Sequence, residues 1–166
     1  MTATEQYVSV LTLLKPGELG LLRTHAGQGL DESVDAFDLF TGLWWPLRQR
    51  NERAPKRDIA WLIAKLYAFC PISHSRGDTL AGQLRLCQPQ ENPARERFQK
   101  KLDQMLMLPV AKIEPALRWA LGRIASKEEK VDWVMLTDDL WRWERESTRL
   151  KWAQQFLGYS ERGKSC

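Results

Sequence analysis

Histidine is scarce in this chain, which has only His25 and His74 among 166 residues. Acid–base and nucleophilic catalysis most often use histidine, and neither of these two lies in a recognisable catalytic context. A phosphate-binding glycine loop is also missing, because the short segment 27–29 (GQG) has neither a further glycine nor a flanking strand. We therefore expect no catalytic residues, no cofactor and no enzyme.

Cysteine is sparse as well, with Cys70, Cys87 and Cys166 in unrelated contexts. An odd count of this kind fits reduced thiols in the cytoplasm better than a disulfide framework. Cys70, His74 and Cys87 could offer soft metal ligands, but no fourth ligand follows at zinc-finger spacing, and Cys70 belongs to an apolar helical face. The sequence therefore predicts a cytoplasmic protein without a metal site.

Long hydrophobic runs are missing. The most apolar run, 59–69 (IAWLIAKLYAF), is short and interrupted by Lys65, and no basic segment precedes the apolar residues of the N-terminus. We expect neither export nor a membrane span. The length of 166 residues fits one domain, which we predict over 1–166, with an N-terminal helix in 1–16 and a disordered tail at 160–166.

Helical periodicity is present almost everywhere instead. Apolar residues recur at three- and four-residue spacing, as one buried face of a helix requires, in four sets: Ile59, Ile63, Leu66 and Cys70; Phe98, Leu102 and Met105; Ile113, Leu117, Leu121 and Ile124; Trp133, Leu136, Leu140 and Trp143. No segment favours a strand. The predicted fold class is all-α, a compact bundle of roughly seven to eight helices without a sheet.

Charge is distributed unevenly along the chain. Residues 1–47 carry six acids and two bases, a net charge of −4, so the remaining 119 residues carry +8. The positive charge is concentrated in 48–57 (RQRNERAPKR) and 95–101 (RERFQKK). Such blocks suit a polyanionic partner, although a basic run on its own is as often a solvated surface.

The segment 137–159 (TDDLWRWERESTRLKWAQQFLGY) mixes aromatic and basic residues. If it forms one helix, Leu136, Leu140, Trp143, Ser147 and Leu150 share an inner face, and three arginines form a stripe elsewhere: Arg142, Arg145 and Arg149. A break near Ser147, which could cap a second helix, would dissolve that stripe. We interpret the tryptophans as core residues and the arginines as phosphate ligands.

Short motifs in a fixed order resemble the CasB family, the small subunit of the type I-E CRISPR Cascade complex. They are GELGLLR (17–23), WLIAKLYAFCP (61–71), RERF (95–98), ALRWAL (116–121), VDWVMLTDDLWRW (131–143) and LKWAQQF (150–156). The resemblance implies an all-helical subunit without an active site, which forms a dimer in the complex. It also implies contacts between basic residues and two DNA strands of the R-loop, the target strand and the displaced strand, alongside the CRISPR RNA and other Cascade subunits.

The resemblance transfers residue by residue to a few positions. Arg23 matches a family arginine, although Thr24 replaces the next one, and Lys151 matches one of two basic residues, with Leu150 in place of the other. Arg97 and Arg118 match further family arginines, and Arg142 matches the residue before the motif tryptophan Trp143. The block 48–57 is included on charge alone. The complete set of predicted nucleic-acid ligands is Arg23, Arg48, Arg50, Arg53, Arg57, Arg97, Lys100, Lys101, Arg118, Arg123, Arg142, Arg149 and Lys151.

Two other functions stay open from the sequence. A purely structural assembly subunit would use its aromatic face and its acidic N-terminal third to dock partner proteins. A hydrolase would need a divalent metal on Asp31, Asp35 and Asp38, which we place on one helical face; acids in the first turns of a helix are, however, favoured by its dipole without any metal.

Overall fold

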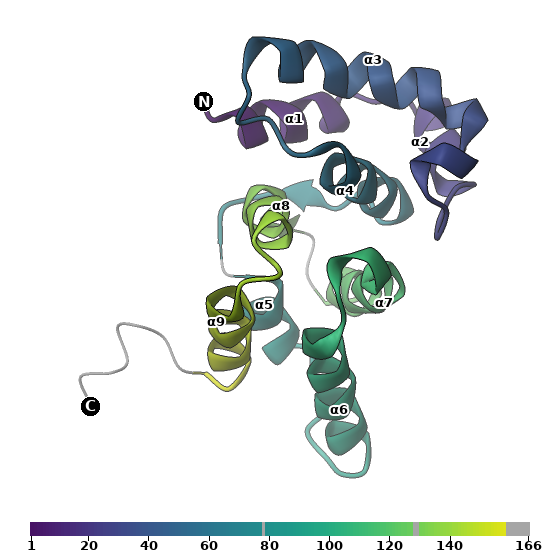
Figure 1. Cartoon of the computed structure of the whole chain (residues 1–166). Coiled ribbons are helices and arrows are strands. Elements are labelled where there is room, and N and C mark those ends of the chain that lie inside the picture. Colours follow the sequence, from purple (N-terminus) through teal and green to yellow (C-terminus); the bar gives the residue numbers. More distant parts are fainter. Residues whose placement is uncertain (78, 128–129, 159–166) are drawn as a thin grey trace.

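The computed structural model describes residues 1–77, 79–127 and 130–158 (Figure 1). Within these ranges the helices are α1 (Ala3–Thr12), α2 (Pro16–Arg23), α3 (Val34–Arg50), α4 (Arg57–Phe69), α5 (Leu80–Arg85), α6 (Ala94–Met107), α7 (Glu114–Ala125), α8 (Trp133–Trp141) and α9 (Glu146–Phe156), with the 3₁₀ turns η1 (Leu30–Glu32) and η2 (Val110–Lys112). The all-α prediction is confirmed. One local exception is the parallel pair β1 (Ser73–His74) and β2 (Lys130–Val131), which the sequence did not predict.

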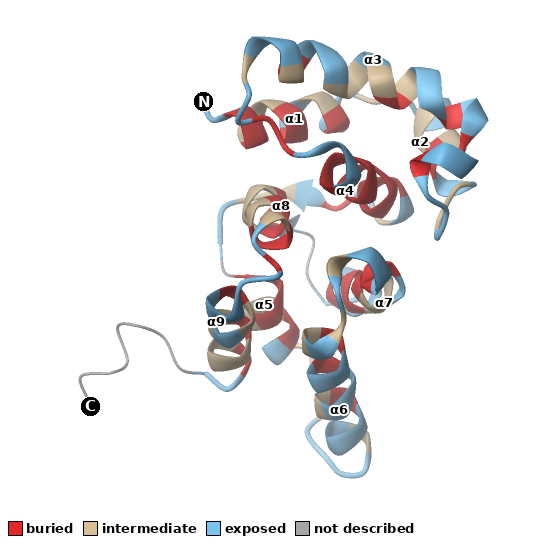
Figure 2. Ribbon diagram, viewed as in Figure 1, coloured by how far each residue is buried: buried red, intermediate tan, exposed pale blue. Residues whose placement is uncertain are grey.

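Helix α4 is the centre of the fold. Its residues Ile59 to Ala68 are all buried, and it packs against α2, α3, α7 and α8. Figure 2 shows α4 as the most continuously buried helix, whereas α3 and α6 present exposed faces. The buried position of α4 explains why its sequence is the most apolar run of the chain.

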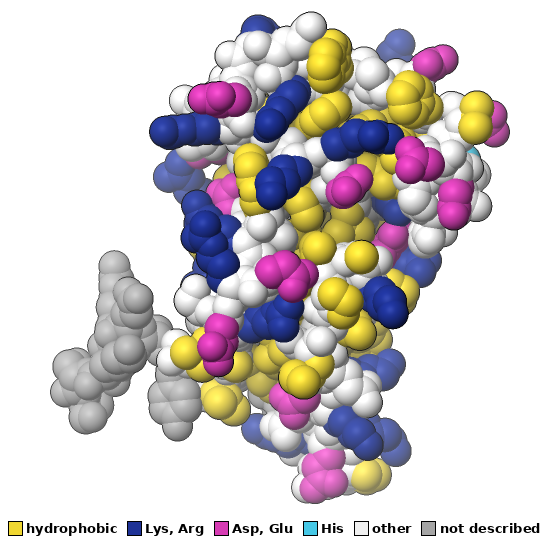
Figure 3. All heavy atoms as spheres, in the orientation of Figure 1, with side chains coloured by type: hydrophobic (Ala, Val, Ile, Leu, Met, Phe, Trp, Pro, Cys, Tyr) yellow, Lys and Arg dark blue, Asp and Glu magenta, His cyan; other side chains and the backbone are white. Residues whose placement is uncertain are grey.

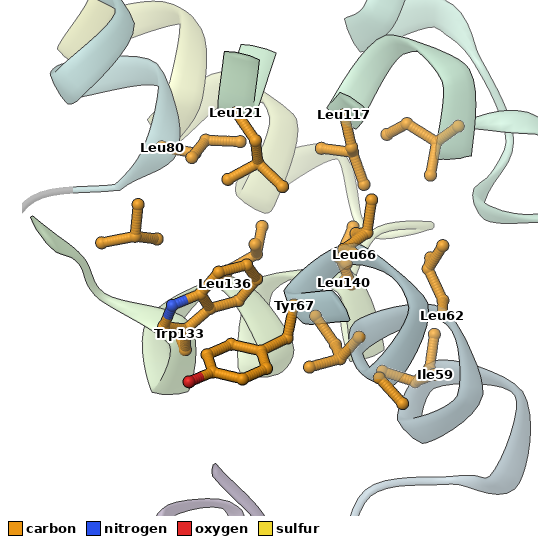
Figure 4. Close-up of a cluster of buried hydrophobic side chains, with 14 of the residues drawn as sticks. Ile59, Leu62, Leu66, Tyr67, Leu80, Leu117, Leu121, Trp133, Leu136 and Leu140 are labelled. Carbon is orange, nitrogen blue, oxygen red and sulfur yellow. The ribbon is translucent and has the colours of Figure 1, made fainter. Parts of the chain in front are cut away.

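The expected inner faces meet in one hydrophobic core. Leu66 of α4 lies near Leu117 of α7 and Leu140 of α8 (Figure 4). All residues of the sets from α6, α7 and α8 are buried, as predicted, and Cys70 alone of the α4 set is only partly buried. Burial of side chains of this size stabilises the fold by about 1.5 to 3 kcal/mol each before entropic losses.

A buried ion pair joins distant parts of the chain. The ammonium of Lys65 lies 2.6 Å from a carboxylate oxygen of Glu114 in α7 and donates to the carbonyl of Gln28 at 2.6 Å. The other oxygen of Glu114 accepts the backbone N–H of Gly27 at 2.8 Å. These bonds fix the loop after α2 against α4 and α7, because a buried charge must be paired and hydrogen-bonded.

The helices are arranged in two groups around α4 and α8. In Figure 1, α1, α2 and α3 form the upper part, while α5, α7 and α9 lie below, and α6 extends to the end farthest from α3. None of the described helices is both long and apolar enough to cross a membrane.

The N-terminal end of the chain differs from the sequence prediction. The N-terminal helix predicted over 1–16 stops at Thr12, and Pro16 opens α2, since proline fits the first turn of a helix. The predicted tail at 160–166 lies outside the described residues, so one domain over 1–166 stays a prediction.

The C-terminal segment is broken close to Ser147, which is the alternative that the sequence left open, but the capping residue differs. Helix α8 ends at Trp141 and α9 begins at Glu146, with Arg145 and not Ser147 at its N-cap. The break rotates the two halves, so the continuous arginine stripe does not form. It also leaves Leu150 exposed, contrary to its predicted inner position.

Candidate nucleic-acid interface

A groove on the surface brings together three segments that are far apart in the sequence. Its walls are the loop after α3 and the end of α8 with the turn that follows, and residues at the N-terminus complete it. It encloses about 870 Å³ and is lined by Thr2, Ala3, Thr4, Asn51, Glu52, Arg53, Lys56, Asp138, Trp141, Arg142, Glu144 and Arg145. This volume is within the range of ligand pockets, about 300 to 1,000 Å³.

The first wall is held by the end of α3. The guanidinium of Arg48 donates to the carbonyls of Glu52 and Ala54, at 2.5 and 3.0 Å, and the indole N–H of Trp44 donates to the carbonyl of Pro55 at 2.7 Å. These bonds fold the loop back against the helix. Arg48 therefore supports the wall, while Arg53 on the same loop is exposed.

The second wall is anchored by Trp143. This residue is fully buried, its indole N–H donates to the carbonyl of Leu108 at 2.8 Å, and its ring meets Trp152 edge to face at 4.9 Å between centroids. Its neighbours Arg142 and Arg145 are exposed. The buried tryptophan thus fixes a turn that presents two arginines to solvent.

The cations of the groove are not neutralised by ion pairs. Within the described part of the chain, Arg53, Lys56, Arg142 and Arg145 have no salt-bridge partner; Lys56 instead lies 6.0 Å from the centre of the Trp141 ring. Unpaired cations around a concave surface attract anions.

Two of the three groove acids are occupied by other groups. The Glu144 carboxylate accepts from Arg149 at 3.1 Å and from the backbone N–H of Val110 at 3.2 Å. Asp138 accepts the hydroxyl of Thr4 at 2.9 Å, and burial raises the pKa of its carboxyl group against the opposing effects of that bond and of nearby Arg142. The groove is therefore most positive around its four unpaired cations, Arg53, Lys56, Arg142 and Arg145, in the described part of the chain.

Several predicted ligands are engaged within the protein. Arg57 lies 3.0 Å from Asp31, and the ammonium of Lys151 lies 2.7 Å from the buried Asp139. Arg149 donates to the carbonyl of Trp143 at 2.9 Å as well as to Glu144. Their role as nucleic-acid ligands stays a prediction, but each has a structural task that the sequence did not reveal.

A second basic surface lies on α6. Its residues Arg97, Lys100 and Lys101 are exposed, and none of them has a salt-bridge partner among the described residues. The ammonium of Lys101 lies 5.2 Å from the centre of the Trp119 ring on α7, and Trp119 also contacts Phe98. Figure 3 shows Lys and Arg side chains over α6 and others along the upper left edge beside α8.

Helix α7 adds two further predicted residues. Arg118 is partly buried, and both its Nε and the indole nitrogen of the adjacent Trp119 are buried without a hydrogen-bond partner among the described residues. Arg123 is exposed in the last turn of the helix.

The predicted set is thus divided among separate places. Arg53 and Arg142 line the groove, whereas the residues of α6 lie at the far end of the molecule (Figure 1). Arg23 and Arg50 are exposed in the last turns of α2 and α3, and each donates to a carbonyl of its own helix.

Two cations and one aromatic residue of the groove were missing from the predicted set. Lys56 belongs to the basic block 48–57, and Arg145 follows Arg142 by three residues, so charge alone could have included both. Trp141 was interpreted as a core residue with the other tryptophans, but it lies at the end of α8 and lines the groove. No sequence signal marks that position.

The acidic residues considered for a hydrolase are arranged differently from the expectation. Asp31 lies in η1, whereas Asp35 and Asp38 lie in α3, so the three do not share one helical face. Among the residues that the structure describes, no group of three or more His, Cys, Asp or Glu side chains is placed to hold a metal ion. Asp31 pairs with Arg57 instead.

Comparison with known proteins supports the resemblance seen in the motifs. The chain is similar in structure to CasB from M. ruber (TM-score 0.72, 21% identity, 99% of this chain and 97% of that one) and to CasB from Thermus thermophilus (0.73, 23%, 95% and 99%). CasB from Thermobifida fusca is also similar (0.68, 18%, 93% and 94%). No significant match was found among curated proteins.

A family model described as CRISPR-associated protein Cse2 matches residues 18–157. This range contains the basic residues of the groove and of α6, and all the motifs named above except the first residue of the earliest one. The chain therefore belongs to the Cse2 (CasB) family of CRISPR-associated proteins, the family of a type I-E Cascade subunit.

Proposed function

We propose that this subunit stabilises the R-loop of type I-E Cascade through contacts with the phosphates of the target strand and the displaced strand. The observation that carries the proposal is the presence of exposed cations without salt-bridge partners on two surfaces, the groove and α6. Exposed cations of this kind do not stabilise a protein core, whereas they bind the phosphates of nucleic acids.

The mechanism needs no sequence recognition by this subunit. In RNA-guided recognition the guide reads the sequence by base pairing, and exchange of a DNA duplex for a heteroduplex is nearly balanced in free energy. Modest phosphate contacts can therefore decide whether the R-loop persists. Each contact releases condensed counterions, so retention of DNA weakens as salt is raised.

The partners of this function are the CRISPR RNA, both DNA strands and the other Cascade subunits, with a second copy of the chain beside the first, in the cytoplasm. Protein contacts have a suitable surface on α3, where Val34, Phe37 and Trp45 are exposed at helical spacing. The acids Asp35 and Asp38 flank them. This face favours the assembly role, which is compatible with DNA binding elsewhere on the molecule.

The test is charge reversal in reconstituted Cascade. The variant R97E/K100E/R142E affects one residue of the groove and two of α6, and we expect faster loss of target DNA from an intact complex. The control K15E/K112E/K127E makes the same change in net charge at three exposed positions outside both surfaces. Retention is measured by DNA dissociation and assembly by size-exclusion chromatography.

Equal retention by the variant and wild-type complexes would contradict DNA binding and leave the assembly role. Equal weakening by the variant and its control would show an effect of total charge only, and would also contradict the proposal.

A further inference from the structure

The tryptophans of this chain divide into two kinds by the use of their indole N–H groups. Five donate to a backbone carbonyl or carboxylate inside the protein: Trp44, Trp61, Trp133, Trp143 and Trp152. The other three, Trp45, Trp119 and Trp141, have no hydrogen-bond partner for their N–H in the described part of the chain, and of these Trp141 lines the groove and is only partly buried. It is placed to contact a ligand more than to hold the core.

The face of the Trp141 ring is not occupied by another aromatic residue among those described. Its one recorded ring neighbour is the ammonium of Lys56, 6.0 Å from the ring centre. That distance is the outer limit of a cation–π contact. A flexible lysine at this range can move aside for a flat group and pair with its phosphate.

The charges of the groove indicate how such a ligand would lie. Arg53, Arg142 and Arg145 supply positive charge. Three acids also line the groove: the partly buried Asp138, and the exposed Glu52 and Glu144, of which Glu144 is paired with Arg149. A phosphate is attracted to the arginines and repelled by Asp138, while an uncharged base is not repelled. The arrangement therefore suits a ligand with an anionic backbone and a neutral planar group.

We propose that the groove holds one unpaired nucleotide of single-stranded DNA, with its base stacked on Trp141 and its flanking phosphates bound by Arg142 and Arg145. This inference rests on the proposed function and adds to it a base-binding site on the subunit. Every base has a π-face, so the contact tolerates any sequence. An acidic peptide fits less well, because its carboxylates would meet Asp138.

The experiment compares two single-stranded oligomers of equal length, oligothymidylate and an abasic oligomer with the same phosphates. Binding to the purified full chain is measured by fluorescence anisotropy. We expect wild type to prefer the base-bearing oligomer by about fivefold or more, the order of one aromatic stacking contact. Trp141→Ala is expected to remove this preference while leaving affinity for the abasic oligomer unchanged.

The matched control is Trp45→Ala. Trp45 is 48% exposed and, like Trp141, has no partner for its indole N–H among the described residues, but it lies on α3 outside the groove. This control should keep the preference for bases. If Trp141→Ala does not fold, as judged by circular dichroism, Trp141→Leu preserves an apolar side chain without a π-face and carries the same test.

The outcomes separate the two proposals. Salt-sensitive binding of both oligomers without a preference for bases would overturn the base-binding site and leave R-loop stabilisation intact, and a preference that survives in the Trp141 variant would do the same. Failure of wild type to bind either oligomer would overturn the base-binding site, while R-loop stabilisation is decided by charge reversal in the intact complex.

Discussion

Four basic residues near the C-terminus show how similar side chains serve different purposes. Arg142 and Arg145 lie in the turn after α8 and have no ion pair in the described part of the chain, whereas Arg149 and Lys151, in α9, are bound to Glu144 and Asp139. The first pair is available to a ligand, and the second holds the two helices together. Position in the fold, and not residue type, separates the two roles.

The structural role is clearest at Asp139. Its carboxylate is almost fully buried and accepts one hydrogen bond from the Lys151 ammonium at 2.7 Å and one from the Trp152 indole at 2.8 Å. A buried carboxylate is tolerated only when it is paired and hydrogen-bonded. Lys151 therefore stabilises α9 by compensating this buried charge.

The largest expected effect follows from removal of that carboxylate. Asp139→Ala should lower the free energy of unfolding by about 2 to 4 kcal/mol, because it leaves the buried Trp152 N–H and the Lys151 ammonium without their acceptor. Urea denaturation measures the change. The control is Glu144→Ala, which removes the exposed acceptor of Arg149 and should cost about 1 kcal/mol or less. Equal costs would contradict the distinction between the pairs.

DNA binding provides a second way to separate the pairs. Arg142→Ala with Arg145→Ala should weaken binding of single-stranded DNA and reduce the salt slope by roughly 1.4, or about 0.7 for each phosphate contact. The free energy of unfolding should change by about 0.5 kcal/mol or less, as is usual for exposed side chains. Binding is titrated at several salt concentrations.

Arg149→Ala serves as the comparison, with the opposite result expected. It removes the bond to the Trp143 carbonyl and should cost about 1 to 2 kcal/mol of stability, with little change in salt slope. A loss of slope in Arg149→Ala equal to that of the double variant would place Arg149 among the DNA ligands after all.

The sequence was a good guide to the core. In α6 and α7 the three- and four-residue spacing of apolar side chains identified faces that are buried as predicted, from Phe98 to Ile124. Periodicity works there because each helix is continuous and packs along one side.

The break at 142–145 could not be predicted in the same way. Trp143 fits the inner face of a continuous helix, and it is indeed buried, but its burial is achieved by contacts with Leu108 and Trp152 that stop α8 two residues earlier. Arg149, which was expected to be a free cation in the arginine stripe, instead donates a hydrogen bond to the Trp143 carbonyl. Tertiary contacts of this kind leave no periodic signal.

The groove was beyond sequence reasoning for a related reason. Its walls come from residues 2–4, 51–56 and 138–145, which no local pattern connects. The basic block 48–57 was recognised by its charge, but the different roles of its arginines were not. Arg48 holds the loop by hydrogen bonds, whereas Arg53 is exposed on it.

The smallest expected effect concerns Asp138, the partly buried one of the three groove acids. Burial raises its pKa above the ordinary value of 3.8, so the folded state holds this proton more tightly than the unfolded state. The free energy of unfolding therefore falls as the pH rises from 3.8 through the raised pKa of Asp138, because the carboxyl group ionises over that interval. Asp138→Asn should remove this loss, making the variant at least as stable as wild type at neutral pH and equal to it in acid.

The same change should strengthen binding of single-stranded DNA by about two- to fivefold, because one repulsive charge leaves the groove. Asparagine keeps an oxygen that can accept the Thr4 hydroxyl, so the wall is preserved. Glu32→Gln, at an exposed position in η1, alters net charge equally outside the groove and should not change affinity to this extent. Equal gains in both variants would mean that DNA senses only the total charge and that Asp138 does not face the bound strand.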